Sequence, residues 1–397
     1  ASGKVEGFLV IADLQTHDKQ KTILSGNMRV INSRLRDAMF FYQNDLNLVK
    51  VHGMRAWNDK LKSVRFHEKL GSQYDRVERI VKIAILLARK FDLEQDAVQK
   101  AATLIKADLV SELVTEFPSL QGLMGAHYAE IEGCEKLVSD AIRDHYLPVG
   151  SNDLVPKQSL SIIMALSDKI EYLTCLWKIG IKPTGNKDPF ALRRASLGII
   201  RIILENKLDV DLDYLIDLTK VNFDMSDLQL FLKERIINYL IEKNYQKKVV
   251  EAVVKQYKLD FLPILPRLIT EITEFISSVS GVKFLAVYKR VFNLLSSKKE
   301  FVSFKKKTFE ERATEEDKTL QKQLVLIKEQ VEESLQHKDF KKALLSLGSM
   351  VNPVNQFLDN VQVNCEDKEL QNLRYSLLNK ISETTDSVVV FSELDNK

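Results

Sequence analysis

Hydrophobic residues recur at steps of three and four along most of this chain, which is the period of an α-helix with one buried face. A clear example is the stripe formed by Val77, Ile80, Val81, Ala84, Leu87 and Ala88. The same pattern predicts helices over 97–115, 134–146, 159–179, 189–206, 226–243, 247–257, 264–278, 283–297, 317–336, 340–350, 353–361 and 368–385. We therefore expect a mainly α, multi-domain helical protein.

The first 50 residues are the only stretch that mixes two periods. The continuous apolar run from Phe8 to Ala12 predicts a short buried strand. After a polar loop the pattern becomes helical beyond Gly26, with a helix through Arg34 to Asp45. These features predict a short α/β remnant at the N-terminus, in a chain that begins inside a domain.

Three breaks interrupt the helical pattern. The Pro- and Gly-containing stretches 147–156 and 179–189 are predicted loops. At the end of the second loop, Asp188 is expected to cap a helix whose first position is Pro189. The third break, 296–318, is predicted to be an exposed connector with a basic half and an acidic half. Its charged residues are Lys298, Lys299, Lys305, Lys306 and Lys307, followed by Glu310, Glu311, Glu315 and Glu316.

Composition narrows the class of protein. With 45 % hydrophobic residues and only 14 Gly and 8 Pro, the chain is excluded from the disordered and collagen-like classes. A formal net charge of +3 means that an anionic partner must be held by local basic patches. Three scattered cysteines indicate a reducing compartment, so we expect a cytoplasmic protein. No apolar run reaches the 18 or so residues that a membrane span needs, so no membrane segment is predicted.

Common catalytic templates are absent from the sequence. It contains no Gly-rich nucleotide-binding motif, no HExxH or paired CxxC metal motif and no GxSxG motif. Asp108 and Asp168 each lie on an apolar helix and could converge on a divalent metal. However, Ala107 precedes Asp108 where a further ligand would be useful, so buried acids with hydrogen-bond partners are the favoured interpretation. We predict no catalytic residue and no cofactor in this chain.

Two local patches are candidates for binding nucleic acid. Lys187, Arg193 and Arg194 surround the predicted helix start near Pro189, where cations and free amides suit a phosphate, although a solvated helix face would look the same. The second patch consists of Tyr288, Lys289, Arg290 and Asn293, together with Phe292. It suits single-stranded RNA, because bases stack on aromatic rings and phosphates bind cations. The same residues also fit an ordinary amphipathic helix whose inward face is formed by Val287, Val291 and Leu294.

Several long strings point to one family. In order, they are Lys106-Ala-Asp-Leu-Val110, Glu116-Phe-Pro-Ser-Leu-Gln-Gly-Leu-Met-Gly125, Asp144-His-Tyr-Leu-Pro148, Ser167-Asp-Lys-Ile170, Pro183 to Arg194, Tyr288 to Asn293 and Asn352 to Asp359. Together they resemble the β subunit of bacterial tetrameric glycyl-tRNA synthetase, over nearly the whole chain. The resemblance implies a C-terminal portion of a longer β subunit that positions tRNA(Gly). Glycine activation, with ATP and Mg²⁺, then belongs to a separate α subunit in an α2β2 assembly, with no DNA and no membrane partner.

The resemblance also implies four regions. Residues 1–63 are expected to be part of an N-terminal body, 64–180 an HD-like helical domain, 181–225 a connector, and 226–397 the helical anticodon-binding domain shared with arginyl-tRNA synthetases. Asp108 and Asp168 match the metal aspartates of the HD family, but Ala107 stands in place of its histidine, so the metal site is expected to be degenerate. Two alternatives stay open at this point: a metal-dependent HD-type phosphohydrolase and a helical protein-binding scaffold.

Overall fold

The structure is a computed structural model that describes residues 7–13, 16–185, 187–296 and 311–394. The chain forms two compact units. Unit 1 comprises Ala1–Ile202 with Leu218–Val221, and unit 2 comprises Ile203–Asp217 with Asn222–Lys397.

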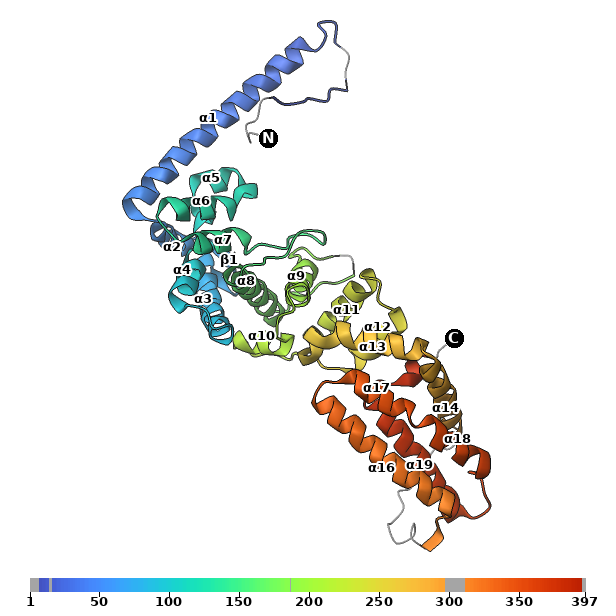
Figure 1. Ribbon diagram of the computed structural model, residues 1–397. Helices are drawn as coiled ribbons and strands as arrows, with labels where there is room; N and C mark the ends of the chain where they lie inside the picture. The colour runs from blue at the N-terminus through green and yellow to red at the C-terminus, as the bar shows by residue number, and fades with distance from the viewer. Residues whose placement is uncertain (1–6, 14–15, 186, 297–310, 395–397) are drawn as a thin grey trace. The chain divides into compact units, whose positions relative to one another are not determined.

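Both units are built almost entirely of helices (Figure 1). Those that begin in unit 1 are α1 (Lys21–His52), α2 (Arg55–Leu61), α3 (Gln73–Lys90), α4 (Gln95–Leu104), α5 (Glu112–Glu116), α6 (Leu123–Ile131), α7 (Lys136–Asp144), α8 (Ser159–Lys178) and α9 (Leu192–Glu205). Those that begin in unit 2 are α10 (Leu212–Leu218), α11 (Ser226–Glu242), α12 (Lys247–Gln256), α13 (Leu265–Ser277), α14 (Val279–Ser296), α16 (Glu315–Gln336), α17 (Phe340–Gly348), α18 (Val351–Asn360) and α19 (Lys368–Asp386). The prediction of a mainly helical protein is confirmed.

The centre of unit 1 is α8. Nearly all of its residues from Leu160 to Trp177 are buried, because α3, α4 and α7 pack around it. A helix that is apolar all round lies in a core. Three charged residues, Asp168, Lys169 and Glu171, are nevertheless buried in α8, and they become important for the site described below.

A small hairpin leads into α3. Strand β1 (Arg65–His67) pairs antiparallel with β2 (Gly71–Ser72), and they are the two strands found in the described part of the chain. The Ser72 side chain then accepts a hydrogen bond from the Asp75 amide, while the Asp75 carboxylate accepts one from the Ser72 amide. This capping box satisfies free amides at the start of α3. It fixes where α3 begins and therefore where Arg76, in its first turn, is placed.

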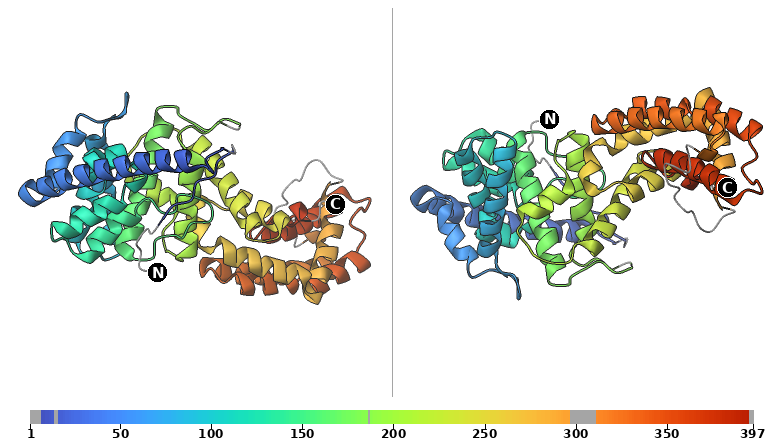
Figure 2. Two further views of the ribbon diagram at one scale, coloured as in Figure 1. Left: turned by 90° about the horizontal axis from the view of Figure 1, so that it is seen from above. Right: turned by 90° about the horizontal axis from the view of Figure 1, so that it is seen from below.

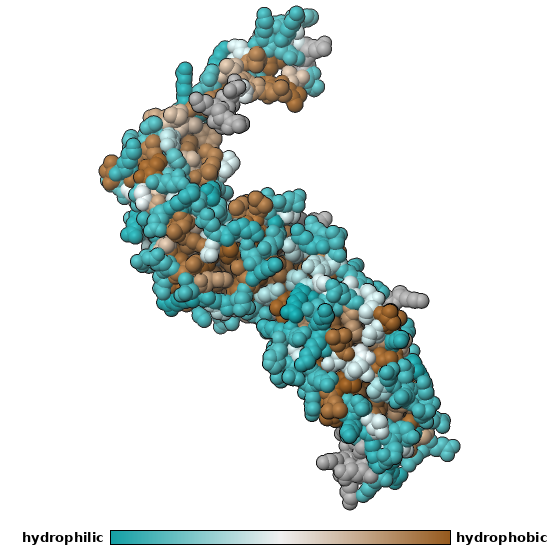
Figure 3. All heavy atoms as spheres, viewed as in Figure 1, coloured by the Kyte–Doolittle hydropathy of each residue, from teal (hydrophilic) through white to brown (hydrophobic). Residues whose placement is uncertain are grey.

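The N-terminal segment differs from the expectation of a buried strand. Residues 8–12 form no strand and are mostly exposed, and Leu9 and Ile11 are 88 % and 92 % accessible. Helix α1 begins at Lys21, before the predicted start, and its buried residues are Asp45 and Val49. The N-terminal half of α1 extends away from the other helices of unit 1, with hydrophobic residues on its surface (Figures 1 and 3). In the described residues no strand pairs with this apolar run, and so it forms no strand itself.

In unit 2, α16 packs against α17, α18 and α19, and α14 packs against α13, α17, α18 and α19. Figure 2 shows these long helices from two further sides. Arg374 of α19 donates a hydrogen bond to the buried Asp317 carboxylate of α16 at 3.3 Å. Asp317 also completes the capping box of α16 with Thr314. One carboxylate thus starts α16 and ties it to α19.

Helix boundaries differ from the predictions at three places. The helix expected over 97–115 is broken into α4, a 3₁₀ turn at Ala107–Val110 and α5. Helix α9 begins at Leu192, so Pro189 precedes it; the Asp188 carboxylate still caps it by accepting from the Leu192 and Arg193 amides. Glu315 and Glu316 lie in the first turn of α16 and do not belong to a connector. The predicted basic half, Lys298 to Lys307, and Glu310 lie outside the described residues.

No described helix combines the length and the apolar character that crossing a bilayer requires.

Candidate functional site

The predicted RNA-contacting residues divide between two faces of α14. Tyr288 is only 5 % exposed, and its hydroxyl donates a hydrogen bond to the Asp386 carboxylate of α19 at 3.2 Å. Burial raises the pKa of Tyr288 to about 12, so the hydroxyl stays protonated and can donate. Its ring faces the helical bundle and is not presented to a base. Tyr288 therefore holds α14 against α19.

The opposite face of α14 carries the other predicted residues. Lys289, Arg290 and Asn293 are exposed there, and Phe292, one turn after Tyr288, lies at the edge of the buried face and is 40 % exposed. The Phe292 ring stacks on the Tyr288 ring with 6.2 Å between centroids, so one side of the Phe292 ring is packed against Tyr288. An exposed ring among cations is the arrangement that binds unpaired bases and phosphates. Phe292 is the aromatic residue of this motif that a base could reach.

Arg290 is held by an exposed pair of partners on α18. Its guanidinium donates to Asn355 Oδ1 at 2.8 Å and to Asp359 Oδ1 at 2.9 Å. Because both charged side chains are about half exposed, their pairing contributes only about 0–1 kcal/mol. Arg290 and Asn293 also line a hollow of about 490 Å³ bordered by residues 361–364. A phosphate or base entering this hollow would replace a weak contact.

The first predicted patch, that of Lys187, Arg193 and Arg194, lies at the start of α9 in unit 1. Arg193 donates to the Gly185 carbonyl and so closes its own loop. Lys187 is exposed, and its backbone pairs with Thr184. Arg194 is exposed and lines a pocket. In the described contacts the three residues do not form one cluster. Arg193 hydrogen-bonds to the loop before α9, whereas Arg194 lines a pocket.

Asp108 is buried beside the start of α6. Its Oδ2 accepts hydrogen bonds from the Gly122 and Gly125 amides at 2.6 and 3.0 Å. Burial raises the pKa of this carboxyl, and the two amide donors act in the opposite direction. Both amides bind its carboxylate directly, so Asp108 fixes the fold of this turn.

Asp168 is bound by cations from two other elements. Its Oδ1 accepts from Arg76 Nη2 at 2.9 Å and lies 3.1 Å from Lys106 Nζ. Burial alone would raise its pKa, but these two cations hold it well below the usual range. In the described ranges, no three or more His, Cys, Asp or Glu residues come together in a way that could hold a metal ion. Asp108 and Asp168 are thus buried acids with partners, the interpretation that the sequence favoured.

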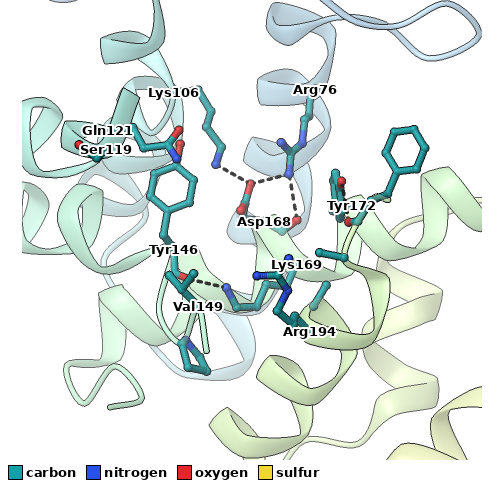
Figure 4. Close-up of a pocket in the computed structure, with 14 residues that line it drawn as sticks. Arg76, Lys106, Ser119, Gln121, Tyr146, Val149, Asp168, Lys169, Tyr172 and Arg194 are labelled. Atoms are coloured by element: carbon teal, nitrogen blue, oxygen red, sulfur yellow. Dashed lines mark hydrogen bonds and ion pairs between the residues drawn. The ribbon is translucent and has the colours of Figure 1, made fainter. Parts of the chain in front are cut away.

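Around Asp168 lies a pocket of about 580 Å³ (Figure 4). In the close-up the ends of Arg76 and Lys106 point at this carboxylate, whereas Lys169 points at Tyr146 and Arg194 lies beside Lys169. Lys169 donates to the Tyr146 carbonyl at 2.9 Å. The Tyr146 ring lies under Lys106 Nζ, 3.9 Å from it, and forms part of the wall. The pocket therefore combines several cations with aromatic surface.

The lysines of this pocket stand in an unusual environment. Burial lowers the pKa of Lys106 and of Lys169 to about 8, against an ordinary value of 10.5. Lys106 Nζ lies 2.8 Å from Nε2 of the fully buried His145, whose Nδ1 lies 2.6 Å from the Ile142 carbonyl. Burial and the Lys106 charge lower the pKa of His145 well below its usual value. His145 is therefore neutral: Nδ1–H donates to the carbonyl and Nε2 accepts from Lys106.

Sequence reasoning missed this cluster, although one signal was present. Arg76 lies four residues before Ile80, on the apolar face of α3. In the same way, Lys169 and Glu171 interrupt the apolar run of α8. A charged residue at a core position of a helical stripe needs a buried partner. The identity of the partners was hidden, because Arg76 and Asp168 are 92 residues apart.

Two family models match the chain. Residues 284–388 match the DALR anticodon binding domain, which identifies the class of the C-terminal region as a helical anticodon-binding domain. Residues 2–255 match the glycyl-tRNA synthetase beta subunit. Because that second model covers more than half of the chain, the chain belongs to the glycyl-tRNA synthetase β-subunit family. The resemblance drawn from the sequence strings is confirmed.

Curated relatives extend the similarity over the whole chain. The chain is 36 % identical over 399 residues to the glycine–tRNA ligase beta subunit of Paracoccus denitrificans, covering 99 % of this chain and 58 % of the relative. It is 36 % identical over 401 residues to that of a Ruegeria species, with the same coverage. With that of a Janthinobacterium species it shares 35 % over 393 residues, or 98 % of this chain and 55 % of the relative. The chain thus spans a little over half the length of these relatives.

Proposed function

We propose that this chain is a tRNA-binding part of glycine–tRNA ligase. Its role is to position tRNA(Gly) so that a separate catalytic α subunit, which holds ATP and Mg²⁺, attaches glycine. In this proposal the chain contributes no catalytic residue, and the two kinds of subunit assemble as α2β2. The proposal places the protein in the cytoplasm.

The observation that supports the proposal is the exposed face of α14. It lies within the stretch that matches the anticodon-binding model, and it presents Phe292 beside Lys289, with the exposed Arg290 further round the helix. Phosphate contacts from the cations would position the RNA, and the ring would stack on an unpaired base. The hollow beside Arg290 and Asn293 offers space for a neighbouring nucleotide. We expect Arg193, Arg194 and Lys187 to add weaker phosphate contacts.

Neither alternative has a specific observation in its favour. The phosphohydrolase needs a metal at Asp168, whose carboxylate is already paired with Arg76 and Lys106. A scaffold that binds only protein gives no reason for the exposed cations and the exposed ring of α14. The two alternatives predict, respectively, a phosphatase activity lost in Asp108→Asn and an absence of salt-dependent RNA binding.

The test is filter binding of a tRNA(Gly) transcript at two salt concentrations. Replacing Lys289 and Arg290 together by alanine should weaken binding about tenfold and lower the log–log salt slope by about 1 for each lost phosphate contact. The thermal midpoint should change little, because both side chains are exposed.

The matched control replaces Lys247 and Lys248, an adjacent exposed basic pair at the start of α12 in the same unit. This variant should bind tRNA like the unchanged chain. Equal losses in both variants would show that bulk charge, and not the α14 face, holds the RNA. Absent or salt-insensitive binding by the unchanged chain would overturn the proposal.

A further inference from the structure

The pocket around Asp168 in unit 1 contains more positive than negative charge. Its linked side chains include four cations, Arg76, Arg79, Lys106 and Lys169, but the carboxylates that form ion pairs with them in the described structure are two, Asp168 and Glu171. Asp108, a third acid near Lys106, is bonded to the Gly122 and Gly125 amides. Even if Asp108 is counted as charged, positive charge stays in excess, and Arg194 adds another cation where it lines the pocket.

Buried charge of one sign is costly unless an opposite charge compensates it. Lys106 is 1 % exposed and Lys169 is 8 % exposed, so water compensates them poorly. Lys169 is the least compensated of the set. The hydrogen bond recorded for its ammonium goes to a neutral carbonyl, that of Tyr146, and not to a carboxylate. An anion with more than one negative charge, bound beside Lys169 and Arg194, would remove this imbalance.

The walls of the pocket suit a ligand that is not purely ionic. The rings of Tyr146, Tyr172 and Phe190 line it, and Ser119 and Gln121 add polar groups. Tyr172 donates a hydrogen bond to the Phe190 carbonyl at 3.0 Å, so the two walls are tied together. Flat aromatic surfaces next to cations accommodate a base and its phosphate. A volume of about 580 Å³ lies within the range of about 300–1,000 Å³ that is usual for small-ligand sites.

We propose that this pocket binds a terminal phosphate monoester carried by a nucleotide, with the phosphate between Lys169 and Arg194 and the base against Tyr172 and Phe190. A terminal phosphate carries about −1.5 to −2 charges near pH 7, which matches the excess positive charge. A phosphodiester within an RNA strand carries one charge and continues on both sides. It therefore fits poorly against cations that are buried at the end of a pocket.

A terminal phosphate of this kind has two sources, a free nucleotide or the 5′ end of an RNA. Titration calorimetry on the full chain distinguishes them, using each ribonucleoside 5′-monophosphate, each nucleoside, inorganic phosphate, and a short RNA with and without a 5′-phosphate. At least one monophosphate, free or at the RNA end, should bind at least tenfold tighter than its nucleoside or 5′-hydroxyl counterpart. Binding of the free nucleotide assigns a small ligand, and binding of the phosphorylated RNA alone assigns an RNA end.

Lys169→Met is the informative variant, because it keeps the length of the side chain and removes the charge. It should weaken binding of that monophosphate at least tenfold, and Arg194→Gln should weaken it less, since Arg194 is exposed. Arg89→Gln, at an exposed position of α3, is the matched control and should bind normally. Thermal melting must show that Lys169→Met is folded, which is expected because it loses a poorly compensated charge.

Three results would overturn the proposal. The first is that no monophosphate binds more tightly than a Kd of about 1 mM, and the second is that inorganic phosphate binds as tightly as the nucleotide. The third is that a folded Lys169→Met binds like the unchanged chain. The proposal is separate from the role of α14 in binding tRNA, because the paired Lys289 and Arg290 replacements leave this pocket intact.

Discussion

The cations of the pocket in unit 1 and those of α14 in unit 2 carry the same formal charge in opposite surroundings. Arg76 is 8 % exposed and binds two buried carboxylates, those of Asp168 and Glu171. Arg290 pairs with Asp359, but both side chains are about half exposed. Buried pairs are expensive to break, whereas exposed pairs contribute little. The comparison teaches that Arg76 is part of the fold, while Arg290 is available to exchange its partner for a phosphate.

The sharpest way to break this comparison is to remove one carboxylate from each pair. Asp168→Ala leaves Arg76 and Lys106 buried without their shared partner, so it should lower the free energy of unfolding of unit 1 by about 3–5 kcal/mol. Asp359→Ala should lower the free energy of unfolding of unit 2 by only about 0–1 kcal/mol. Urea denaturation checks both values.

Two spectroscopic signals separate the units in that experiment. The chain has two tryptophans, Trp57 and Trp177, and both lie in unit 1, so tryptophan fluorescence reports on that unit. Far-ultraviolet circular dichroism reports on the helices of both. Equal losses in the two variants would contradict the distinction between structural and exchangeable cations.

A second prediction concerns the two aromatic residues of α14. Phe292→Ala should weaken tRNA binding by about 1–3 kcal/mol, the usual loss when a stacked base is deprived of its ring, with little change in stability. Tyr288→Phe should cost about 1 kcal/mol of stability, because the hydrogen bond to Asp386 is lost, and should leave binding unchanged. Filter binding measures the tRNA affinity of both variants, and thermal melting measures their stability. The reverse pattern would mean that Tyr288 reaches the RNA.

The smallest expected effect is a difference in pH dependence. Burial lowers the pKa of Lys169 to about 8, so above pH 8 the folded chain releases this proton before the unfolded chain, whose lysine titrates near 10.5. The unfolded state then binds more protons, and stability rises with pH over this window. Between pH 7.5 and 9.5 the unchanged chain should therefore gain on the order of 1 kcal/mol relative to Lys169→Met.

Two buried cysteines titrate in the same pH window, and comparing the two chains removes their effect. Burial raises the pKa of the Cys134 thiol, and raises that of Cys175 to about 12. These thiols keep their protons in the folded state, so they lower stability as pH rises through the same window. Both chains contain them, and their effect cancels in the comparison. Identical pH profiles for the two chains, measured by fluorescence in urea, would show that the Lys169 ammonium is as well solvated as in water.

Much of the fold could be predicted from the sequence, because hydrophobic residues recur every three to four positions along a helix that buries one face. The expected helix over 159–179 corresponds to α8 (Ser159–Lys178), and that over 368–385 corresponds to α19 (Lys368–Asp386). The predicted strand at 8–12 was wrong because an apolar run forms a strand only if another strand pairs with it. Nothing in the local pattern indicates whether such a partner exists.

The candidate site was harder to predict than the fold. On α14 the helical phase of Phe284, Tyr288, Val291 and Leu295, all buried, places Tyr288 inside and Lys289 and Asn293 outside, so the phase alone could have separated these residues. The pocket could not be assembled in this way. Its members include residues of α3, α8 and α9, the turn before Ala107 and the segment after α7, and their meeting depends on tertiary packing. A local pattern marks a buried charge but does not show which distant residue compensates it.

The contact between Asp108 and Gly125 reverses the usual ranking of residues for a helix. Alanine is the best helix former and glycine one of the poorest, yet a methyl group at position 125 of α6 would lie 2.9 Å from both Asp108 Oδ2 and Ile142 Cγ2. The amide that binds the carboxylate is reachable only because the position has no side chain. A substitution that strengthens α6 as an isolated peptide would therefore loosen it in the folded chain.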